Sequence, residues 1–376
     1  MAAGERAGGS DRRLLILTDD FSGGTGNHLL SVAERCAGAG WRVEVASFQP
    51  RRTRRDPEAV ELTRLPSPSG PSVYPLHQVA RLRQVARLVR DRSPDVLHVY
   101  FFWPILYGRL LKAAGAVSCL IENREDEGFN WGAHEYVWLR LTRRLPDQVV
   151  CVSEAIRRLV IDREKLEPAQ ATVIHNGIAE PDPVDPSSVG ALRDELGIPE
   201  DAPVVGMVAN LDRAVKGGER FLRAVPLILD EVPEARFIVV GGGSEDDATD
   251  AALRSAGIED RVFFPGYRPD VDVFYDLMDV SVLTSSSEGL SITLLESMSR
   301  GLPVVATRVG GNAELVVEGA TGYLVPPDDV RAFAKRVASL LRDPALRERF
   351  GRAGRKRVRA EFDLEDVVEK YRWLYR

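Results

Sequence analysis

The sequence predicts an α/β protein built from two doubly wound parallel-sheet domains. Short apolar runs of strand length alternate with helix-spaced segments in both halves of the 376-residue chain. A break at residues 179–188, rich in Pro and Asp, separates the halves, and the chain is long enough for two hydrophobic cores. Strands that alternate with helices form parallel sheets, which bind ligands at the carboxyl ends of their strands.

In the first half, strands are expected where short apolar runs end at polar or turn residues: 14–18, 42–47, 96–100, 117–121, 148–152 and 172–175. Helices are expected where apolar residues recur at helical spacing: 28–39, 76–92, 136–144 and a segment from residue 154. The second half repeats the alternation, with strands at 204–208, 236–240, 261–264, 280–284 and 303–306. We therefore expect domains at residues 12–182 and 188–356, and a final segment at 357–376.

The composition favours a cytoplasmic enzyme. A net charge of −6 and a pI near 5.6 argue against nucleic acid as a partner. Cys36, Cys119 and Cys151 are odd in number and lack metal spacing, which indicates buried thiols in a reducing compartment. No secretory signal is visible, and no apolar segment approaches the ~20 residues of a membrane span.

The stretch from residue 279 to 328 carries the most informative pattern. Glu288 lies in a polar loop after a strand, and Glu296 lies in the helix that follows. The backbone N–H groups of Leu290, Ile292 and Thr293 are at the helix start, where unpaired donors favour an anion. A phosphate-binding helix start flanked by carboxylates that can hold hydroxyls suits a sugar nucleotide. The alternative is two structural carboxylates, one solvated and one on a helix face.

A second pattern follows the first strand of the second domain. Lys216 precedes Gly217 at the start of a helix, and a mobile ammonium there suits a diphosphate leaving group. The alternative is a solvated lysine at a helix end. Asp270 and Asp272 mimic a metal-binding Asp-x-Asp, but they precede a helix at 271–278, so we interpret Asp270 as its N-cap and expect no metal.

A third pattern is the Gly-rich loop at residues 20–27, directly after the first strand. Its glycines allow a close backbone approach to a phosphate. The spacing from Gly24 and Gly26 reaches Leu29 where a dinucleotide fingerprint needs glycine, so NAD binding is disfavoured. Glu44, which could serve as a ribose-binding acid, is equally an exposed strand residue. A plain tight turn is the remaining alternative for the loop.

Together these residues resemble the signature of glycosyltransferase family 4. The specific part comprises Glu288 to Met298, Gly301–Thr307, Gly310 with Gly311, and Gly322–Asp328. Looser matches lie at residues 23–24, 94–99, 152–154, 175–178, 216–217, 240–243 and 262–266, and the likeness extends over about residues 12 to 350.

The resemblance implies the GT-B architecture of two facing Rossmann-like domains. The first would bind the acceptor and the second the nucleotide-sugar donor, while the helix from Asp363 would cross back to the first domain. It also implies transfer with retention of configuration, and neither a metal nor another cofactor. Lys216 and Glu288 are the implied catalytic residues. The implied donor-binding residues are Gly23, Gly24, Asn210, Arg213, Lys216, Gly289, Leu290, Ser291, Ile292, Thr293 and Glu296.

Within that set, the resemblance implies a role for each key group. Glu296 would bind the ribose hydroxyls and Glu288 the transferred sugar. Lys216 would bind the diphosphate with the N–H groups at the helix start, and Gly24 would close over it from the first domain.

Two departures from the family pattern matter. The family commonly has Arg six residues before the lysine, whereas this chain has Asn210, and we hypothesise that Arg213 replaces it. Many members carry a His after the strand expected at 117–121, where this chain has Glu122, Arg124 and Glu125 in a polar run. We interpret that run as an acceptor-recognition loop, and the alternative is a solvated charge run.

The helix at 79–92 carries Arg81, Arg83, Arg87 and Arg90 between apolar residues, and residues 51–55 add further arginines. Such a surface could rest on an anionic membrane at the inner face. We favour the alternative of a helix packed on the sheet with a solvated Arg face.

The sequence therefore predicts a retaining, metal-independent glycosyltransferase of the hexosyltransferase type, which moves a sugar from a nucleotide-diphosphate donor to a hydroxyl acceptor. The acceptor could be a glycan, a lipid-linked sugar or a small molecule. A sugar-nucleotide epimerase of the same fold and a non-catalytic nucleotide-sugar-binding protein remain alternatives. The nucleotide base, sugar and acceptor stay open.

Overall fold

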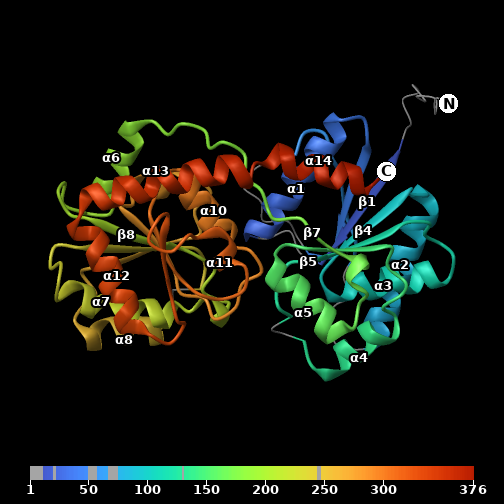
Figure 1. Cartoon of the computed structure of the whole chain (residues 1–376), viewed down its shortest axis with the longest axis horizontal. Coiled ribbons are helices and arrows are strands. Elements are labelled where there is room, and N and C mark those ends of the chain that lie inside the picture. Colours follow the sequence, from blue (N-terminus) through green and yellow to red (C-terminus); the bar gives the residue numbers. More distant parts are fainter. Residues whose placement is uncertain (1–11, 20–22, 50–56, 67–74, 129–130, 244–246) are drawn as a thin grey trace. The chain divides into compact units, whose positions relative to one another are not determined.

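The computed structural model describes residues 12–19, 23–49, 57–66, 75–128, 131–243 and 247–376. The chain divides into two compact units (Figure 1). The first unit comprises the chain up to Ile174 together with Glu365–Arg376, and the second comprises His175–Leu364. The Pro- and Asp-rich segment at 179–188 thus belongs to the second unit, where the Glu180 carboxylate pairs with Arg355 and Arg359.

The first unit contains a parallel seven-stranded sheet. Its strands are, from one edge to the other, β3 (Glu61–Arg64), β2 (Arg42–Ser47), β1 (Arg13–Thr18), β4 (Val96–Tyr100), β5 (Leu120–Arg124), β6 (Gln148–Cys151) and β7 (Ala171–Val173). Its helices are α1 (Gly23–Gly38), α2 (Pro75–Arg92), α3 (Phe102–Ala113), α4 (Ala133–Leu141), α5 (Glu154–Glu164) and α14 (Leu364–Leu374), with a 3-10 turn η1 (Pro168–Gln170).

Helices cover both faces of this sheet (Figure 1). Successive residues of a strand point to opposite faces. In β5, Asn123 accepts a hydrogen bond from the Tyr371 hydroxyl of α14 (3.2 Å), while Glu122 binds Arg109 of α3. The α14 helix and α3 therefore lie on opposite faces. The Tyr375 hydroxyl near the C-terminus also bonds the buried His98 ring of β4 at 2.8 Å.

The second unit contains a parallel six-stranded sheet. Its strands are β10 (Val262–Gly266), β9 (Arg236–Val240), β8 (Val204–Val208), β11 (Val280–Leu283), β12 (Val304–Thr307) and β13 (Gly322–Val325). Its helices are α6 (Pro186–Glu195), α7 (Gly218–Leu229), α8 (Asp247–Ala256), α9 (Val271–Leu277), α10 (Ile292–Ser299), α11 (Asn312–Leu315), α12 (Val330–Arg342) and α13 (Pro344–Glu361), with a 3-10 turn η2 (Ala214–Lys216).

Two apolar layers enclose the second sheet. One joins the sheet to α7 and α12 and contains Phe221, Phe237 and Phe333. The other joins it to α6 and α9 and contains Leu192 and Phe274. Burial on both faces explains why the strands are continuous apolar runs, because a parallel sheet covered by helices exposes neither face to water. The predicted class, two doubly wound parallel sheets, is confirmed.

Several predicted elements have the predicted bounds, and others differ. The strands at 96–100, 204–208 and 236–240 are correct, whereas β3, β13 and α3 were missed. The strand expected at 117–121 is β5, which begins three residues later and includes charged positions. Glu44 is buried rather than exposed, because its carboxylate binds Arg92 (2.6 Å) and the Thr63 hydroxyl (2.5 Å).

The Arg-rich helix α2 packs against the sheet through Val85 and Val89. Arg81 does not belong to its exposed surface: the side chain is buried over the Phe48 ring, with Asp19 3.8 Å away. Residues 51–55, which the sequence added to this surface, lie outside the described residues. None of the helices in the described part of the chain is long and apolar enough for a membrane span.

All three cysteines are free thiols. Cys36 and Cys151 are buried as predicted, and burial raises the pKa of each thiol to about 12. Cys119 is only half-buried.

Candidate active site

The strand order of the second sheet reverses between β8 and β11. The chain continues from β8 to β9 on one side, and β11 pairs with β8 on the other. Loops that leave the carboxyl ends of two such strands diverge, and this divergence is where doubly wound sheets bind ligands. The loop after β8 carries Asn210, Arg213 and Lys216, and the loop after β11 carries Glu288.

Hydrogen bonds join these two loops. The Ser286 N–H donates to the Val215 carbonyl (2.8 Å), and the Thr284 hydroxyl donates to the Gly217 carbonyl (2.7 Å). Gly217 has φ 71°, and a Cβ there would lie 2.1 Å from the Thr284 carbonyl oxygen. Only glycine allows this approach. Lys216 is therefore held at a fixed position beside the β11 loop.

The two predicted catalytic side chains form an ion pair. The Lys216 ammonium lies 2.8 Å from Glu288 Oε1, which also accepts a 2.5 Å hydrogen bond from the Ser285 hydroxyl. The Glu288 side chain is 8% exposed and that of Lys216 21% exposed, so the ammonium has the greater access to solvent. The ammonium carries three N–H donors, so a second anion at its exposed side would compete with Glu288 for this cation.

The helix α10 begins one residue after its N-cap, Ser291. The Ser291 hydroxyl accepts the Leu294 N–H at 3.3 Å, and the Thr293 hydroxyl donates to the Val208 carbonyl at 3.2 Å, which places the helix start beside the end of β8. Among the described residues no acceptor takes the N–H groups of Ile292 and Thr293. The start of α10 can therefore bind an anion, as the sequence pattern predicts.

Glu296 lies on the buried side of α10 and is 9% exposed. Its Oε2 accepts a 2.7 Å hydrogen bond from the hydroxyl of Tyr275, a residue of α9 that is fully buried. A buried carboxylate needs such hydrogen-bond partners because the loss of its hydrating water would otherwise make its burial unfavourable. The bond fixes the orientation of the Glu296 carboxylate.

A third loop, after β12, packs against the β11 loop that carries Glu288 and Gly289. A Cβ on Gly310, which has φ 46°, would lie 1.6 Å from the Glu288 carbonyl oxygen, and the Gly311 N–H donates to the Gly289 carbonyl at 2.9 Å. The Asn176 amide donates to the Leu290 carbonyl at 3.2 Å. Sequence reasoning missed Asn176 and Tyr275 as supports, since neither lies near α10 in sequence.

Asn210 and Arg213 belong to the same loop as Lys216 and are both exposed. The Asn210 side-chain oxygen accepts the Asp212 N–H at 3.1 Å, so it closes the loop. In the first unit, Gly23 begins α1 with φ 71° and Gly24 follows it, both after β1. Residues 20–22 of that Gly-rich loop lie outside the described residues.

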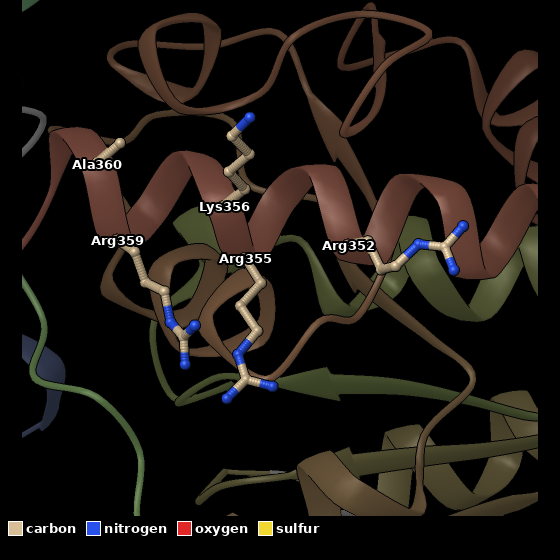
Figure 2. Close-up of a pocket in the computed structure, with 5 residues that line it drawn as sticks. All are labelled: Arg352, Arg355, Lys356, Arg359 and Ala360. Carbon is tan, nitrogen blue, oxygen red and sulfur yellow. The ribbon is translucent and has the colours of Figure 1, made fainter.

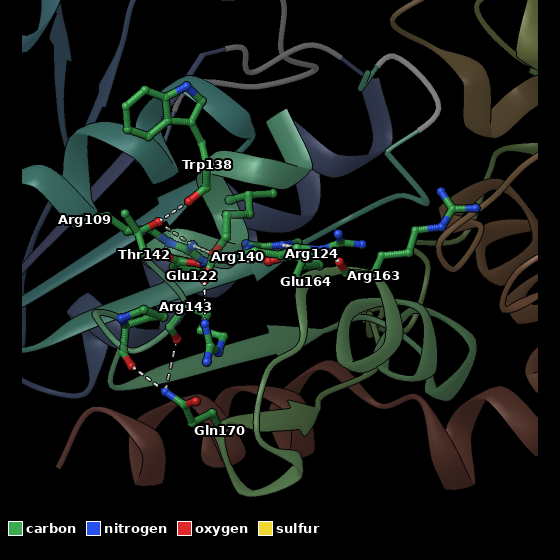
Figure 3. A network of polar contacts seen from close by, with 12 residues as sticks. Arg109, Glu122, Arg124, Trp138, Arg140, Thr142, Arg143, Arg163, Glu164 and Gln170 are labelled. Carbon is green, nitrogen blue, oxygen red and sulfur yellow. Dashed lines mark hydrogen bonds and ion pairs between the residues drawn. The ribbon is translucent and has the colours of Figure 1, made fainter. Parts of the chain in front are cut away.

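The prediction of an acceptor-recognition loop is wrong for Glu122 and Arg124. Glu122 and Arg124 belong to β5 and are at most 2% exposed (Figure 3). Arg109 binds Glu122 through two nitrogens (2.6 and 2.8 Å), and Arg124 binds both Glu164 (2.9 Å) and Glu122 (2.9 Å). Burial favours the neutral carboxyl, but the two guanidinium groups outweigh it and lower the pKa of Glu122.

This buried network excludes the solvated charge run as well as an acceptor role for Glu122 and Arg124. Glu125, half-buried just after β5, is hydrogen-bonded by the Asn123 amide.

The Asp-x-Asp pair is engaged in ion pairs. Asp270 stands at the N-cap position of α9 but its side chain makes no capping bond, because it pairs with Arg268 at 2.8 Å. Asp272 lies 3.0 Å from Arg300. Among the described residues no group of three or more His, Cys, Asp or Glu side chains could hold a metal ion.

A basic hollow of about 490 Å³ lies along α13 (Figure 2). It is lined by Arg352, Arg355, Lys356, Arg359 and Ala360. Glu180 binds Arg355 and Arg359, and Glu348 binds Arg352, so two carboxylates compensate part of the charge of its four cations.

Two family models match nearly the whole described chain. A model described as Glycosyltransferase Family 4 matches residues 22–180, and one described as Glycosyl transferases group 1 matches residues 189–357. The second match contains every residue that the second unit contributes to the site except Asn176.

Among curated proteins, N-acetyl-alpha-D-glucosaminyl L-malate synthase of Bacillus anthracis is 33% identical over 184 residues, 49% of this chain and 48% of that protein. The chain spans about half the length of the first curated relatives it matches. A UDP-Gal:alpha-D-GlcNAc-diphosphoundecaprenol alpha-1,3-galactosyltransferase of Escherichia coli is 23% identical over 299 residues, 77% of each chain.

Solved structures share the fold. A sucrose-phosphate synthase from Thermosynechococcus elongatus superposes with a TM-score of 0.82, at 23% identity, over 97% of this chain and 98% of that one. An Anabaena protein solved in complex with UDP-glucose gives 0.81 at 20% identity, over 95% and 97%.

Proposed function

The chain belongs to glycosyltransferase family 4 and has the GT-B fold, and on that premise we propose that it moves a sugar from a nucleoside diphosphate to a hydroxyl acceptor with retention of configuration and without a catalytic metal. The observation that carries the proposal is the convergence of the Lys216 ammonium, the N–H groups of Ile292 and Thr293, and the Glu296 carboxylate at the β8–β11 divergence. These are a cation and donors for a diphosphate beside an acceptor for ribose hydroxyls.

In this proposal the diphosphate leaves as the bond from the sugar C1 to its phosphate oxygen breaks. Lys216 and the start of α10 stabilise the growing negative charge. The acceptor oxygen bonds to C1 on the same face, and its proton passes to the departing phosphate oxygen, so no protein base is required. Binding of the diphosphate draws the ammonium away from Glu288, which then contacts a hydroxyl of the transferred sugar.

The second unit would hold the donor and the first unit the acceptor. Gly23 and Gly24 would approach the diphosphate from the first unit, and Glu125 remains a candidate for acceptor recognition. The Escherichia coli relative is named for a diphosphoundecaprenol-linked acceptor. A lipid-linked acceptor would bring this chain, as a cytoplasmic enzyme, to a membrane surface.

The test is the binding of UDP, GDP, ADP and TDP, measured as the shift that each nucleotide causes in the thermal unfolding of the protein. The UDP-glucose complex of the Anabaena structure makes UDP the first choice. A nucleotide at a hundred times its Kd stabilises the fold by about 2.7 kcal/mol. Lys216→Ala should abolish most of the shift, while the matched control Lys335→Ala, an exposed lysine of α12, should retain it. Equal shifts in both variants would refute the proposed site.

Turnover then separates the enzyme classes. Transfer requires an acceptor, whereas an epimerase changes the donor sugar without one, and a binding protein does neither. Product that appears only when an acceptor is added supports the transferase.

Arg213 is proposed to replace the arginine that the family commonly carries at Asn210. Both lie in the Lys216 loop. Arg213→Ala should weaken nucleotide diphosphate binding, while Arg223→Ala, an exposed arginine on α7, should not. Unchanged binding in Arg213→Ala would remove the residue from the site.

Tyr275 is proposed to position the ribose-binding carboxylate. Tyr275→Phe removes one hydrogen bond to Glu296, worth about 1.5 kcal/mol, and so should raise the donor KM about tenfold with little change in kcat. A change in kcat alone would show that Tyr275 acts elsewhere.

A further inference from the structure

Two backbone N–H groups just before α10 are buried donors without an acceptor. Leu290 and Ser291 are each 4% exposed, and among the described residues no oxygen accepts either N–H. Ser291 caps the helix with its hydroxyl, so its own N–H is not used in the cap. Buried backbone donors in folded proteins are nearly always paired. Water or a bound ligand must therefore supply the acceptor for these two groups.

Each of these N–H groups belongs to a peptide plane whose carbonyl oxygen is already held. The Gly311 N–H donates to the Gly289 carbonyl (2.9 Å), and the Asn176 amide donates to the Leu290 carbonyl (3.2 Å). In a trans peptide the carbonyl oxygen and the N–H of the next residue point in opposite directions. The bond to the Leu290 carbonyl therefore fixes the direction of the Ser291 N–H, which faces away from Asn176.

The Asn176 side chain is committed to this one bond. It is 2% exposed, and its Oδ1 has no partner among the residues that the structure describes. A buried amide that donates but leaves its oxygen unpaired forgoes part of the stabilisation that it could give the fold. The contribution of this side chain is therefore concentrated in its hold on the Leu290 carbonyl.

The segment that carries Asn176 is fixed to the second unit on both sides of this residue. The unit begins at His175, whose ring nitrogen lies 2.9 Å from a carboxylate oxygen of Glu314 in α11. Two residues after Asn176, the Ile178 N–H donates to the Phe362 carbonyl at the end of α13 (2.9 Å). The amide can therefore act as a fixed support for the loop before α10.

The place of the Ser291 N–H in the loop indicates which part of the donor it meets. In the proposed function, on which this inference rests, the diphosphate lies at Ile292 and Thr293, and Glu288 contacts the transferred sugar. The sugar C1 is bonded to the diphosphate, so the sugar ring lies between these two contacts, along the loop that contains Ser291. A sugar hydroxyl oxygen can accept a backbone N–H.

We propose that Asn176 is a positioning residue for the transferred sugar. By holding the Leu290 carbonyl it directs the Ser291 N–H to a sugar hydroxyl, and so orients the sugar between Glu288 and the departing diphosphate. Asn176 itself does not contact the donor. A backbone donor that is oriented in advance needs no reorganisation when the ligand binds. The residue lies 114 positions before Leu290, so the segment with which the chain enters the second unit completes the site.

The test compares the nucleoside diphosphate that gives the largest thermal shift with its glucose conjugate. Calorimetry gives the Kd of both ligands for the parent, for Asn176→Ala and for Asn176→Leu, which nearly keeps the side-chain volume but has no amide. We expect both variants to bind the conjugate about tenfold more weakly than the parent does, which is the loss that accompanies one hydrogen bond. Their Kd for the diphosphate should equal that of the parent. Urea unfolding checks that each variant is folded.

Asn312→Ala is the matched control. Asn312 is fully buried, donates its amide to the Thr307 carbonyl (3.0 Å) and likewise leaves its Oδ1 without a partner among the described residues. This variant should lose stability as Asn176→Ala does, but it should bind both ligands as the parent does.

Three results would overturn the role of Asn176 and leave the proposed function standing. They are an unchanged Kd of the conjugate in the Asn176 variants, an equal loss of affinity for diphosphate and conjugate, and the same selective loss in Asn312→Ala. A parent that binds neither ligand, or Lys216→Ala that binds the diphosphate as the parent does, would refute the proposed function and the role of Asn176 with it.

Discussion

In the proposed function Lys216 contributes to catalysis through the diphosphate, whereas its contribution to stability comes from Glu288, and a double variant separates these two contributions. Its ammonium makes a 2.8 Å charge-assisted hydrogen bond to Glu288, whose side chain is 8% exposed. Lys216→Ala leaves that carboxylate nearly buried with the Ser285 hydroxyl as its remaining side-chain partner. Such a loss costs about 2 kcal/mol of unfolding free energy, less than for a fully buried pair because the lysine is partly exposed.

Adding Glu288→Gln removes the unpaired charge, so the double variant should recover most of the lost stability. It should not recover activity, because in the proposed function the missing ammonium stabilises the departing diphosphate. We expect sugar transfer to fall about 10²- to 10³-fold in both variants.

The assays are urea unfolding without nucleotide and initial rates of donor turnover with acceptor. Lys335→Ala, on the exposed side of α12, controls for loss of a lysine. The reasoning is refuted if Lys216→Ala leaves stability unchanged, or if the double variant regains the transfer rate together with the stability.

Two further predictions concern the close backbone approach at Gly310 and stability in acid. Gly310→Ala would place a methyl group 1.6 Å from the Glu288 carbonyl oxygen, so donor binding should be lost. The control Gly319→Ala is equally at positive φ but has open space around its Cβ, so it should lose only stability. Equal donor affinity in the two variants would contradict this prediction. Burial lowers the pKa of His98 from 6.5 to about 3, so the unfolded chain binds its proton first, and the unfolding free energy should fall by about 2 kcal/mol between pH 7.5 and 5. The urea unfolding midpoint of His98→Gln should lose this part of its pH dependence. A midpoint that changes with pH as steeply as in the parent protein would contradict the assignment to His98.

The segment around α10 could be predicted because its information is local. Apolar runs mark the strands, Ser291 caps the helix, and Glu288 and Glu296 stand at polar joints within a single contiguous stretch. The pairing of Lys216 with Glu288 could not be predicted, because it depends on how two loops that are 72 positions apart in sequence meet at the sheet.

The error at β5 has a different physical origin. Glu122 and Arg124 alternate with other polar residues, a pattern that is typical of a solvated loop. They are buried because Arg109 and Glu164, from α3 and α5, supply opposite charges at 2.6 to 2.9 Å. A strand with charged residues on a covered face can be recognised only when those partners are known. The same holds for Tyr275, whose hydroxyl function becomes evident only beside Glu296.

The most direct test of the central claim is a crystal structure of the chain with a bound nucleoside diphosphate. The account predicts phosphate oxygens within about 3 Å of the backbone nitrogens of Ile292 and Thr293 and of the Lys216 ammonium, with the ribose at Glu296 and the lysine drawn from Glu288. A nucleotide bound elsewhere, with the Lys216–Glu288 pair intact, would contradict it.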